Sequence, residues 1–389
     1  MLNNGSNLQS EPMYSTNGHI IAAIPNLLFD GNTLVADDAT ERWENVGTGT
    51  STFNLNKRDM TVTAGQFAVR GGRVRLPYFS GYPVSIGLSM ERFDTEAGVT
   101  KRVGYFSSNA VTPWNSNKDG VWVEDDGTTK RLIVQNNGVE QFNVPLSDWL
   151  NRERIANYDF SKFTVFYIDY LWQGGLELRL WIKLQQDWVL LHTVAQVGTN
   201  AGPFMQSPNH SPRYELRSTG GAGSFTAICG QVSTMGNVTE AGYIRNSLNV
   251  AGIACNVVGT TYALQGIKKN ATYRSTCAEA SRISAVKTGG GSDQGILLLL
   301  RNPTLSAPLS YAAYGKVDRA IATTQTVTAL GEVIIAAPAK DGVTEVITGN
   351  YRKWMTQTIS NVFDEYVLAY LALTATQTVH GVMTYKEHS

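Results

Sequence analysis

The chain has 389 residues, which is enough for two or three domains on the usual scale of about 100–200 residues each. Only 16% of the residues are charged, and 32 basic residues balance 32 acidic ones. Proteins that wrap nucleic acid usually carry a basic excess, so we expect no nucleic-acid partner, whereas zero net charge favours self-association. No apolar run reaches about 18 residues, so the sequence predicts no membrane span.

Residues 1–56 have the composition of an extended arm. Asn, Gly, Ser and Thr dominate, and no periodicity is sustained. One apolar segment, IIAAIPNLLF at residues 20–29, is suited to extending a sheet or filling a groove. We therefore predict an arm that is anchored on another chain or subunit. Residues 1–18 lack a basic start and an apolar core, so no signal peptide is expected.

Residues 57–238 alternate between short apolar segments and turn-forming dipeptides. Gly71-Gly72, Asp119-Gly120 and Asn137-Gly138 are typical hairpin signals. The candidate strands are residues 60–69, 73–78, 84–90, 102–106, 121–124, 131–134, 211–218 and 224–232. So many closely spaced strands predict an antiparallel sandwich or jelly roll, which buries one face of each strand and limits exposed edges.

The clearest pattern lies within this region and predicts three consecutive antiparallel strands. Residues 163–172 are nearly all aromatic or β-branched, and Gly174-Gly175 then permits a turn. Residues 176–184 alternate, with Leu and Ile on one face and mostly charged side chains on the other. Residues 188–194 supply the third strand.

Residues 239–389 form a second β-rich unit. Its candidate strands are residues 253–258, 273–280, 295–301, 327–335, 344–347 and 367–374. The segment 361–373 is ambiguous, because its aromatic residues fit helical spacing while its continuous apolar run fits a buried strand; we favour the strand. No repeat of about 20–50 residues occurs, so a solenoid is not expected.

Residues that could carry chemistry are few and poorly spaced. No histidine pair has a metal-ligand spacing. We expect His192 to be a packed strand residue, His210 to lie in a rigid surface loop between two prolines, and His388 to be solvated. The three cysteines lack a CxxC spacing, which favours buried thiols over a disulfide framework or a zinc site.

Two further motifs have simple structural interpretations. Asp119, Glu124, Asp125 and Asp126 lack the alternation and closing Glu of a calcium loop, so we predict a solvated hairpin tip. The GGAGS run at residues 220–224 lacks the Lys-Ser/Thr of a phosphate loop, so we predict a hairpin loop. We therefore predict no catalytic residue, no cofactor site and no metal site. A glycosidase-type carboxylate pair stays open, because the fold rather than the spacing sets it.

Three aromatic residues near the centre of the chain are candidates for an interface or glycan contact. Tyr170 and Trp172 share a strand face with Phe166 and Ile168, whereas Trp181 points to the polar side of its own strand. Aromatic side chains are enriched in protein interfaces, and their rings can stack on sugars. The alternative is that a second sheet packs over the face that carries Tyr170 and Trp172.

Three blocks of the sequence carry a resemblance. They are RVGYFSSNAVTPWNSNKDGVWVEDDGTTKRLIVQNNG at residues 102–138, DFSKFTVFYIDYLWQGGLELRLWI at residues 159–182 and SPNHSPRYELRSTGGAGS at residues 207–224. In this order they resemble segments of virion proteins from tailed bacteriophages, and residues 263–275 continue the likeness more weakly. The resemblance brings no catalytic motif with it. It implies a β-sandwich building block of a virus particle, without deciding between tail and head.

Together these patterns predict an all-β chain with two β-sandwich or jelly-roll-like domains and an extended N-terminal arm. The arm covers residues 1–56, a concanavalin- or jelly-roll-like antiparallel sandwich covers residues 57–238, and a second sandwich covers residues 239–389. The resemblance implies a non-enzymatic structural component of a phage tail or its host-facing apparatus, such as a sheath, adaptor or fibre base. Its location would be the virion, assembled in the host cytoplasm.

The expected partners are further copies of the chain, with a trimer as one arrangement, other virion proteins, and a glycan on the host surface. Three alternative functions stay open. They are a head-decoration protein, a carbohydrate-binding module for host attachment, and a polysaccharide depolymerase. The depolymerase requires carboxylates that converge in one cleft.

Overall fold

The computed structural model describes residues 13–14, 20–21, 25–31, 42–108, 114, 118–172, 177–185, 187–195, 202–235, 242–288, 294–339, 342–347, 353–374 and 377–388. Their regular structure is β-strand, apart from three 3-10 helices of three or four residues. None of these helices is long enough to cross a membrane. The prediction of an all-β sandwich protein is confirmed. The predicted turn at Gly174-Gly175 lies outside the described residues.

The chain divides into two compact units. Unit 1 comprises residues 1–240 with 359–361, and unit 2 comprises residues 241–358 with 362–389. The boundary predicted from the sequence lies between residues 238 and 239, two residues before the observed one.

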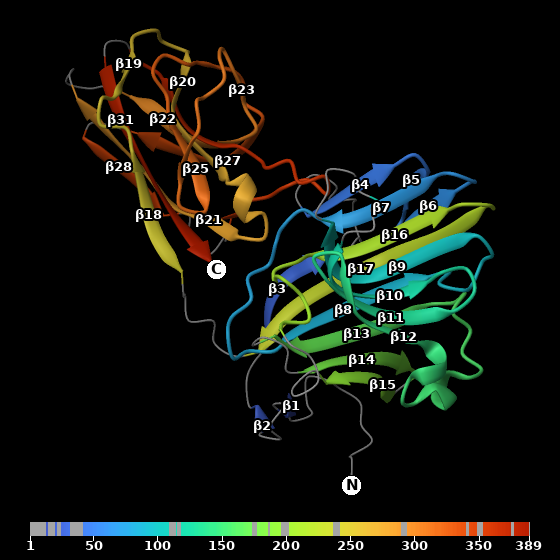
Figure 1. The fold of residues 1–389 in the computed structure, drawn as a ribbon. Helices are drawn as coiled ribbons and strands as arrows, with labels where there is room; N and C mark the ends of the chain where they lie inside the picture. Colours follow the sequence, from blue (N-terminus) through green and yellow to red (C-terminus); the bar gives the residue numbers. More distant parts are fainter. Residues whose placement is uncertain are drawn as a thin grey trace. The chain divides into compact units, whose positions relative to one another are not determined.

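Unit 1 is a sandwich of two antiparallel sheets. The seven-stranded sheet has the order β12 (Val139–Pro145), β11 (Lys130–Asn136), β10 (Lys118–Asp125), β9 (Val99–Ser108), β16 (Pro212–Ser218), β7 (Phe67–Gly72) and β4 (Trp43–Gly47). The eight-stranded sheet has the order β15 (Asp187–Ala195), β14 (Glu177–Leu184), β13 (Thr164–Leu171), β8 (Val84–Glu91), β17 (Gly223–Met235), β6 (Lys57–Val62) and β5 (Thr50–Asn54), and β3 (Pro25–Gly31) also pairs with β17. Neighbouring strands are often distant in sequence; in Figure 1, β16 lies between β7 and β9.

Period-two alternation explains why these segments form strands. On β14, Leu178, Leu180 and Ile182 are buried, whereas the side chains between them are partly exposed. The three central strands are confirmed as β13, β14 and β15. The inner faces of both sheets supply a core that is rich in Tyr, Trp and Phe, and burying one such side chain stabilises the fold by about 1.5–3 kcal/mol.

The sandwich begins earlier in the chain than residue 57. Trp43 on β4 is fully buried, and its ring meets Phe29 of β3 edge-on at a centroid distance of 5.2 Å. A Cβ atom at Gly31 would lie 2.5 Å from the Trp43 ring, so that position has no room for a larger residue. The assignment of residues 43–54 to an arm is therefore wrong, because β4 and β5 pair with β7 and β6 of the same chain.

Two other predicted strands also differ. Residues 60–69 are divided between β6 and β7, which belong to different sheets, and Gly65 in the turn between them has a φ of +81°. Residues 73–78 form no strand. Turns with positive φ favour Gly, so Gly65 was the signal for this break.

Unit 2 is built on two larger sheets around a second core. One has the order β18 (Tyr243–Leu248), β31 (Gln377–His388), β21 (Cys277–Thr288) and β28 (Val343–Ile347). In addition, β19 (Ile253–Cys255) pairs with β31, and β29 (Lys353–Trp354) pairs with β21. The other has the order β24 (Ala312–Tyr314), β25 (Val317–Ile321), β20 (Thr261–Lys269), β30 (Tyr366–Ala372), β22 (Gly295–Arg301) and β27 (Glu332–Ala339). The short strands β23 (Thr304–Leu305) and β26 (Val327–Ala329) pair separately. The ambiguous segment 361–373 contains a strand, β30, as predicted.

Charged residues of unit 1 act within the fold. The buried Lys101 ammonium donates to the carbonyl oxygens of Arg92 and Asp94 at 2.6 and 2.8 Å, and it contacts Glu96 Oε1 at 2.6 Å. A further contact of 3.3 Å reaches Asp94 Oδ1. This oxygen cage fixes the segment that follows β8.

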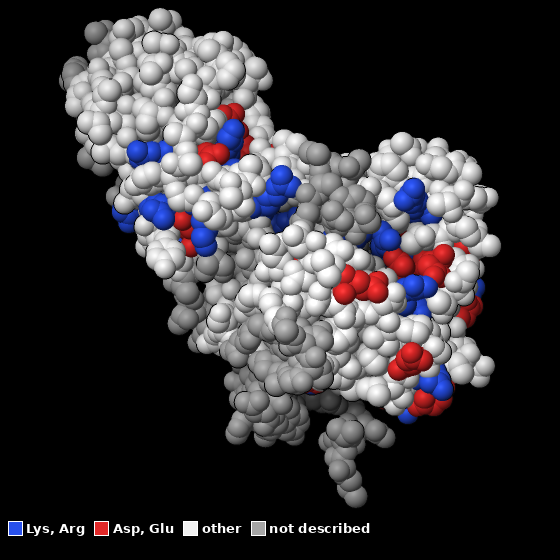
Figure 2. Space-filling view, in the orientation of Figure 1, with Lys and Arg blue, Asp and Glu red and all other residues white. Residues whose placement is uncertain are grey.

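On the face drawn in Figure 2, most described atoms belong to uncharged residues, which agrees with the low charged fraction.

Lys101→Met is expected to lower the free energy of unfolding by about 2 kcal/mol, because it removes the donor to two backbone carbonyl oxygens and breaks the contacts with the partly exposed Asp94 and Glu96 carboxylates. Urea denaturation measures the effect, and the exposed Lys162→Met is the matched control. A Lys101→Met protein as stable as the control would show that the cage does not stabilise the fold.

Candidate functional site

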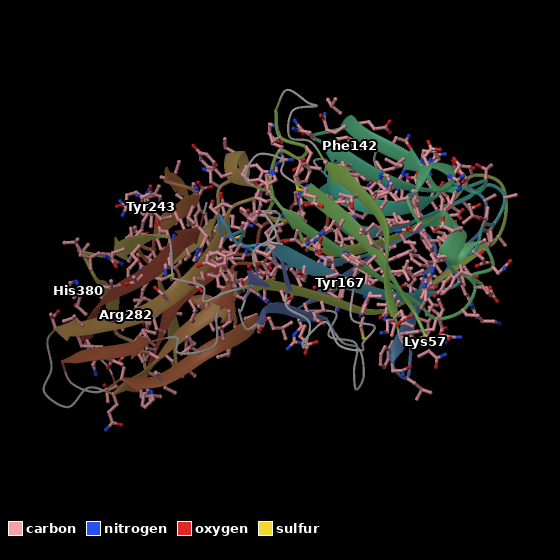
Figure 3. The ribbon with its side chains drawn as sticks, turned by 90° about the horizontal axis from the view of Figure 1, so that it is seen from below. Lys57, Phe142, Tyr167, Tyr243, Arg282 and His380 are labelled. Carbon is pink, nitrogen blue, oxygen red and sulfur yellow. The ribbon has the colours of Figure 1, made fainter. Side chains whose placement is uncertain are left out.

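Three aromatic side chains lie on the outer face of the eight-stranded sheet. They are Tyr167, Trp181 and Trp188, called here the aromatic face, and each is partly exposed. Tyr167 is directly opposite Trp181 in the register, and its ring lies 5.5 Å from that of Trp188 at an interplanar angle of 60°. Tyr167 is labelled in Figure 3. It points outward because its neighbours on β13, Phe166 and Ile168, point into the core.

An ion pair between a buried carboxylate and a partly exposed guanidinium borders the aromatic face. Arg179 Nε donates to Asp169 Oδ1 at 2.8 Å, and the two residues are opposite each other on β14 and β13. Burial raises the pKa of the Asp169 carboxyl to about 6, although Arg179 acts in the opposite direction. The Arg179 guanidinium also lies 5.9 Å from the Trp181 ring centroid, and the Lys183 ammonium lies 5.4 Å from that of Trp188. Aromatic rings therefore stand beside several hydrogen-bonding groups.

On its other side the aromatic face adjoins small residues of β8. Gly87 is opposite Tyr167 and also opposite Gln231 of β17. A Cβ atom at Gly87 would meet only Tyr167 Cδ2 at 3.8 Å and Gln231 Cβ at 3.9 Å, which are ordinary contacts. The exposed Gln231 side chain therefore lies on the other side of Gly87 from the Tyr167 ring. Rings with nearby amide, carboxylate and guanidinium groups suit a polar ligand that has one apolar side.

The structure separates the three predicted aromatic residues. Trp181 belongs to the aromatic face, whereas Tyr170 is 2% exposed in the core and donates a hydrogen bond to Pro208 O at 2.9 Å. The hypothesis of a surface contact is wrong for Tyr170, because the facing sheet and the segment before β16 cover its ring. Trp172 is half-buried, and its Nε1 donates to Met205 O at 3.2 Å.

Sequence reasoning missed Tyr167, Trp188 and Asp169. The strand that contains Tyr167 is apolar almost throughout, so its composition alone does not show which face is outward. The signal was parity: Tyr167 has the opposite parity to Phe166 and Ile168, and pairing β13 with the alternating β14 identifies the outer set.

A row of charges crosses the outer face of the seven-stranded sheet. Its members are directly opposite one another on β11, β10, β9 and β16, and they are Arg131, Glu124, Arg102 and Glu215, called here the charged row. Arg102 Nε donates to Glu124 Oε2 at 2.5 Å, and Arg102 Nη1 donates to Glu215 Oε2 at 3.2 Å. Because the signs alternate, each strand attracts its neighbour.

Two more cations converge on Glu215. Lys118 Nζ and Arg213 Nε donate to its Oε1 at 2.9 and 2.7 Å. Burial alone would raise the pKa of Glu215, but Lys118, Arg213 and Arg102 lower it to about 2. Burial lowers the pKa of Lys118 to about 7, against the attraction of Glu215. A glycosidase acid needs a raised pKa, so Glu215 does not have the properties of a hydrolytic general acid.

The predicted solvated acidic tip is wrong for Asp119, Glu124 and Asp125, which are all buried. Asp125 pairs with Lys130 at 2.7 Å, and Glu124 belongs to the charged row. Asp119 accepts backbone N–H groups of Gln206 and Ser207 at 2.7 and 2.9 Å. Gln206 and Ser207 are far from β10 in sequence, so local spacing gave no sign of this burial.

Asp119 also lies near a histidine and a serine. His210 Nδ1 lies 3.1 Å from Ser107 Oγ, and His210 Nε2 lies 3.4 Å from Asp119 Oδ2. The predicted surface position of His210 is wrong: it is 1% exposed, and burial holds its pKa well below the usual value. The residue types match a nucleophilic triad, but all three side chains are buried and Asp119 is occupied by backbone amides. The arrangement fastens the segment before β16 to β9 and β10.

His388 in unit 2 is likewise buried rather than solvated, and its Nε2 lies 3.3 Å from Glu279 Oε1. His192 is a partly buried strand residue on β15. Cys255 and Cys277 are buried free thiols, and Cys229 is partly buried and also free. Among the described residues, no group of three His, Cys, Asp or Glu side chains has the arrangement of a metal site.

Asp169→Asn is expected to change how stability depends on pH. The folded-state pKa of about 6 exceeds the ordinary 3.8, so the folded chain retains a proton that the unfolded chain releases between these values. The Asp169 contribution to the free energy of unfolding therefore falls as the pH rises from about 4 to 6. Urea denaturation of wild type and variant across this window measures it, with the exposed Asp187→Asn as control. Parallel curves for wild type and Asp169→Asn would contradict the prediction.

Comparison with known proteins gives a fold likeness only. No family model matches the chain, and no curated protein matches its sequence. Similar solved structures include the carbohydrate recognition domain of Emp47p, at 11% identity and a TM-score of 0.36 over 54% of this chain and 96% of that one. A Bacillus licheniformis beta-glucanase has 11% identity and a TM-score of 0.35 over 54% of this chain and 98% of that one. A legume lectin-like domain from Entamoeba histolytica has 12% identity and a TM-score of 0.37 over 54% of this chain and 98% of that one. Because these TM-scores lie below 0.5, the likeness carries no argument about function.

Proposed function

We propose that unit 1 is a carbohydrate-binding module whose ligand lies on the aromatic face. The observation that supports this proposal is the presence of three partly exposed aromatic side chains beside the Asp169–Arg179 ion pair on one sheet face. Partly exposed rings grouped in this way suit a binding surface better than a random surface position. The sheet holds the rings in a fixed register, so little conformational freedom is lost on binding.

The chemistry of a sugar ring matches the two kinds of group on this surface. A pyranose has an apolar C–H face and a polar edge of hydroxyl groups. The rings of Tyr167 and Trp181 would contact the apolar face, while Arg179 and Gln231 lie to their sides for hydrogen bonds to hydroxyls. Asp169 and Arg179 cancel each other's charge, so the preferred ligand is a neutral sugar.

We further propose binding without hydrolysis at this surface. Asp169 has the raised pKa of a general acid, but Arg179 already occupies its Oδ1 and the carboxyl is buried. A glycosidase also needs a second carboxylate at a defined separation on the opposite side of the bond. The role that fits is recognition of a glycan, in keeping with a host-attachment module.

Trp181→Ala is expected to weaken binding of a neutral oligosaccharide at least about tenfold, which corresponds to about 1.4 kcal/mol. A glycan array identifies the sugar, and calorimetry with full-length protein measures the affinity. Phe163→Ala is the matched control, because Phe163 is an exposed aromatic residue that precedes β13 and lies outside the aromatic face. Unchanged glycan binding by both Trp181→Ala and Tyr167→Ala would refute the proposal.

A second proposed role is that of a non-enzymatic structural component of a tailed-phage particle, in the tail or as a head decoration. The three resembling sequence blocks favour it, and so does a group of exposed apolar side chains in unit 2. Tyr243, Ile244 and Leu248 on the edge strand β18 are 68%, 67% and 46% exposed, and Val250 beyond it is 76% exposed. Tyr243 is labelled in Figure 3. An apolar sheet edge of this kind is typical of a surface that associates with another chain.

The double variant Ile244→Ser with Leu248→Ser is expected to reduce self-association, because it removes apolar surface that assembly would bury. Sedimentation at several protein concentrations measures the assembled fraction. Val139→Ser, at a 62% exposed position of unit 1, is the control. A wild-type chain that stays monomeric at all concentrations would remove β18 as an interface between copies.

A further inference from the structure

Several cations lie close together on the outer face of the seven-stranded sheet. Arg102, Lys118 and Arg213 converge on the carboxylates of Glu124 and Glu215 through the ion pairs described above.

A fourth cation, Arg217, stands at the same face. It lies on β16 two residues beyond Glu215, so it shares the outward side of that strand. Arg217 is exposed, and in the described part of the chain it has no ion-pair partner. Its guanidinium is therefore available to a ligand from solvent.

Trp114 collects these cations around one ring. The ring centroid lies 4.4 Å from Arg102 Cζ, 5.5 Å from Lys118 Nζ and 5.5 Å from Arg217 Cζ. A ring face attracts each cation, but the three cations repel one another. The potential at this point is positive and the indole is partly exposed, so an anionic group with an adjoining flat or apolar ring is the complementary ligand.

The same face holds an unused hydrogen-bond donor. Trp122 is 1% exposed, and within the described part of the chain its Nε1 has no hydrogen-bond partner. Trp122 and Arg213 flank Gly104 on either side, since both are opposite Gly104 in the register. A buried donor without an acceptor is costly in free energy. An anion bound at this face would interact favourably with the Trp122 N–H group.

We propose that Trp114, Arg102 and Arg217 form a second glycan site, which recognises an acidic sugar residue through its carboxylate or sulfate group. Guanidinium groups pair with the oxygens of a carboxylate or a sulfate group, and the indole stacks on the sugar ring. The inference rests on the proposed function in assuming a glycan ligand. It adds a different ligand class on the opposite sheet of unit 1, away from the aromatic face.

Lys118 couples this site to pH. The groups that face it are Arg102 on β9, Glu124 on β10, and Arg213, Glu215 and Arg217 on β16. Burial lowers the pKa of Lys118 to about 7, and a nearby bound anion favours its charged form. Acidic-glycan affinity is therefore expected to rise as the pH falls from about 8 to about 6.

The test uses full-length protein and three defined probes: a sulfated heparin oligosaccharide, a polygalacturonate oligosaccharide and a neutral glucan oligosaccharide. Calorimetry at low salt is expected to show binding of at least one acidic probe. Arg217→Glu should weaken that binding at least about tenfold and Trp114→Ala should also weaken it, whereas Arg217→Lys should retain part of the affinity. Arg154→Glu is the control, because Arg154 is an exposed residue of the short helix η2 (Arg152–Ile155).

Three outcomes would overturn the inference. The first is that neither acidic probe binds, and the second is that Arg217→Glu has no more effect than Arg154→Glu. The third is that single-stranded DNA of equal charge binds equally well with the same dependence on Arg217. The two glycan proposals remain separable: Trp181→Ala should leave acidic-probe binding intact, and Arg217→Glu should leave neutral-probe binding intact. If the wild-type chain binds an acidic probe but no neutral probe, the aromatic-face proposal is refuted and the acidic site is unaffected.

Discussion

The packing of two sheets around one aromatic core decides which side chains of unit 1 can meet a ligand. Every second side chain of a strand points into this core, as Phe166 and Ile168 do on β13 and Tyr214 and Leu216 do on β16. The residues between them are then fixed on an outer face. The aromatic face and the charged row are consequences of the same alternation, one on each sheet. A shift of one residue in either register would exchange surface for core.

The chain has few charged residues, and part of them lie inside the fold. With only 16% charged residues, the chain places several of them in buried positions, where they bond to opposite charges or to polar groups of the protein. Glu215 receives three cations, and Lys101 receives four oxygen contacts. Such clusters impose geometry, because leaving one partner unsatisfied in a low dielectric is far more costly than the net gain from the pair. The Glu215 cluster joins β9, β10 and β16, and Lys101 joins β9 to the segment after β8.

The sequence allowed the β class, the central three strands and the outward position of Trp181 to be predicted, because period-two alternation is a local property. It could not reveal the buried state of Asp119 or His210, since their partners come from segments about 90 residues away. It also missed β20, in which the buried polar residues Gln265 and Lys269 bond to Ser247 and Gln357 and break the apolar pattern. Of the candidate site, Trp181 was identified, whereas Tyr167 and Trp188 required the strand register.

The oxygen cage of Lys101 has a wider consequence. Two carbonyl oxygens and two carboxylates around a positive centre form a ligand set of the kind that loops offer to calcium, yet here the centre is covalently part of the chain. The conformation of this loop therefore depends on a side chain of the protein and not on a bound metal ion. It does not change with the metal-ion concentration of the solution, and a chelating buffer has no ion to remove there.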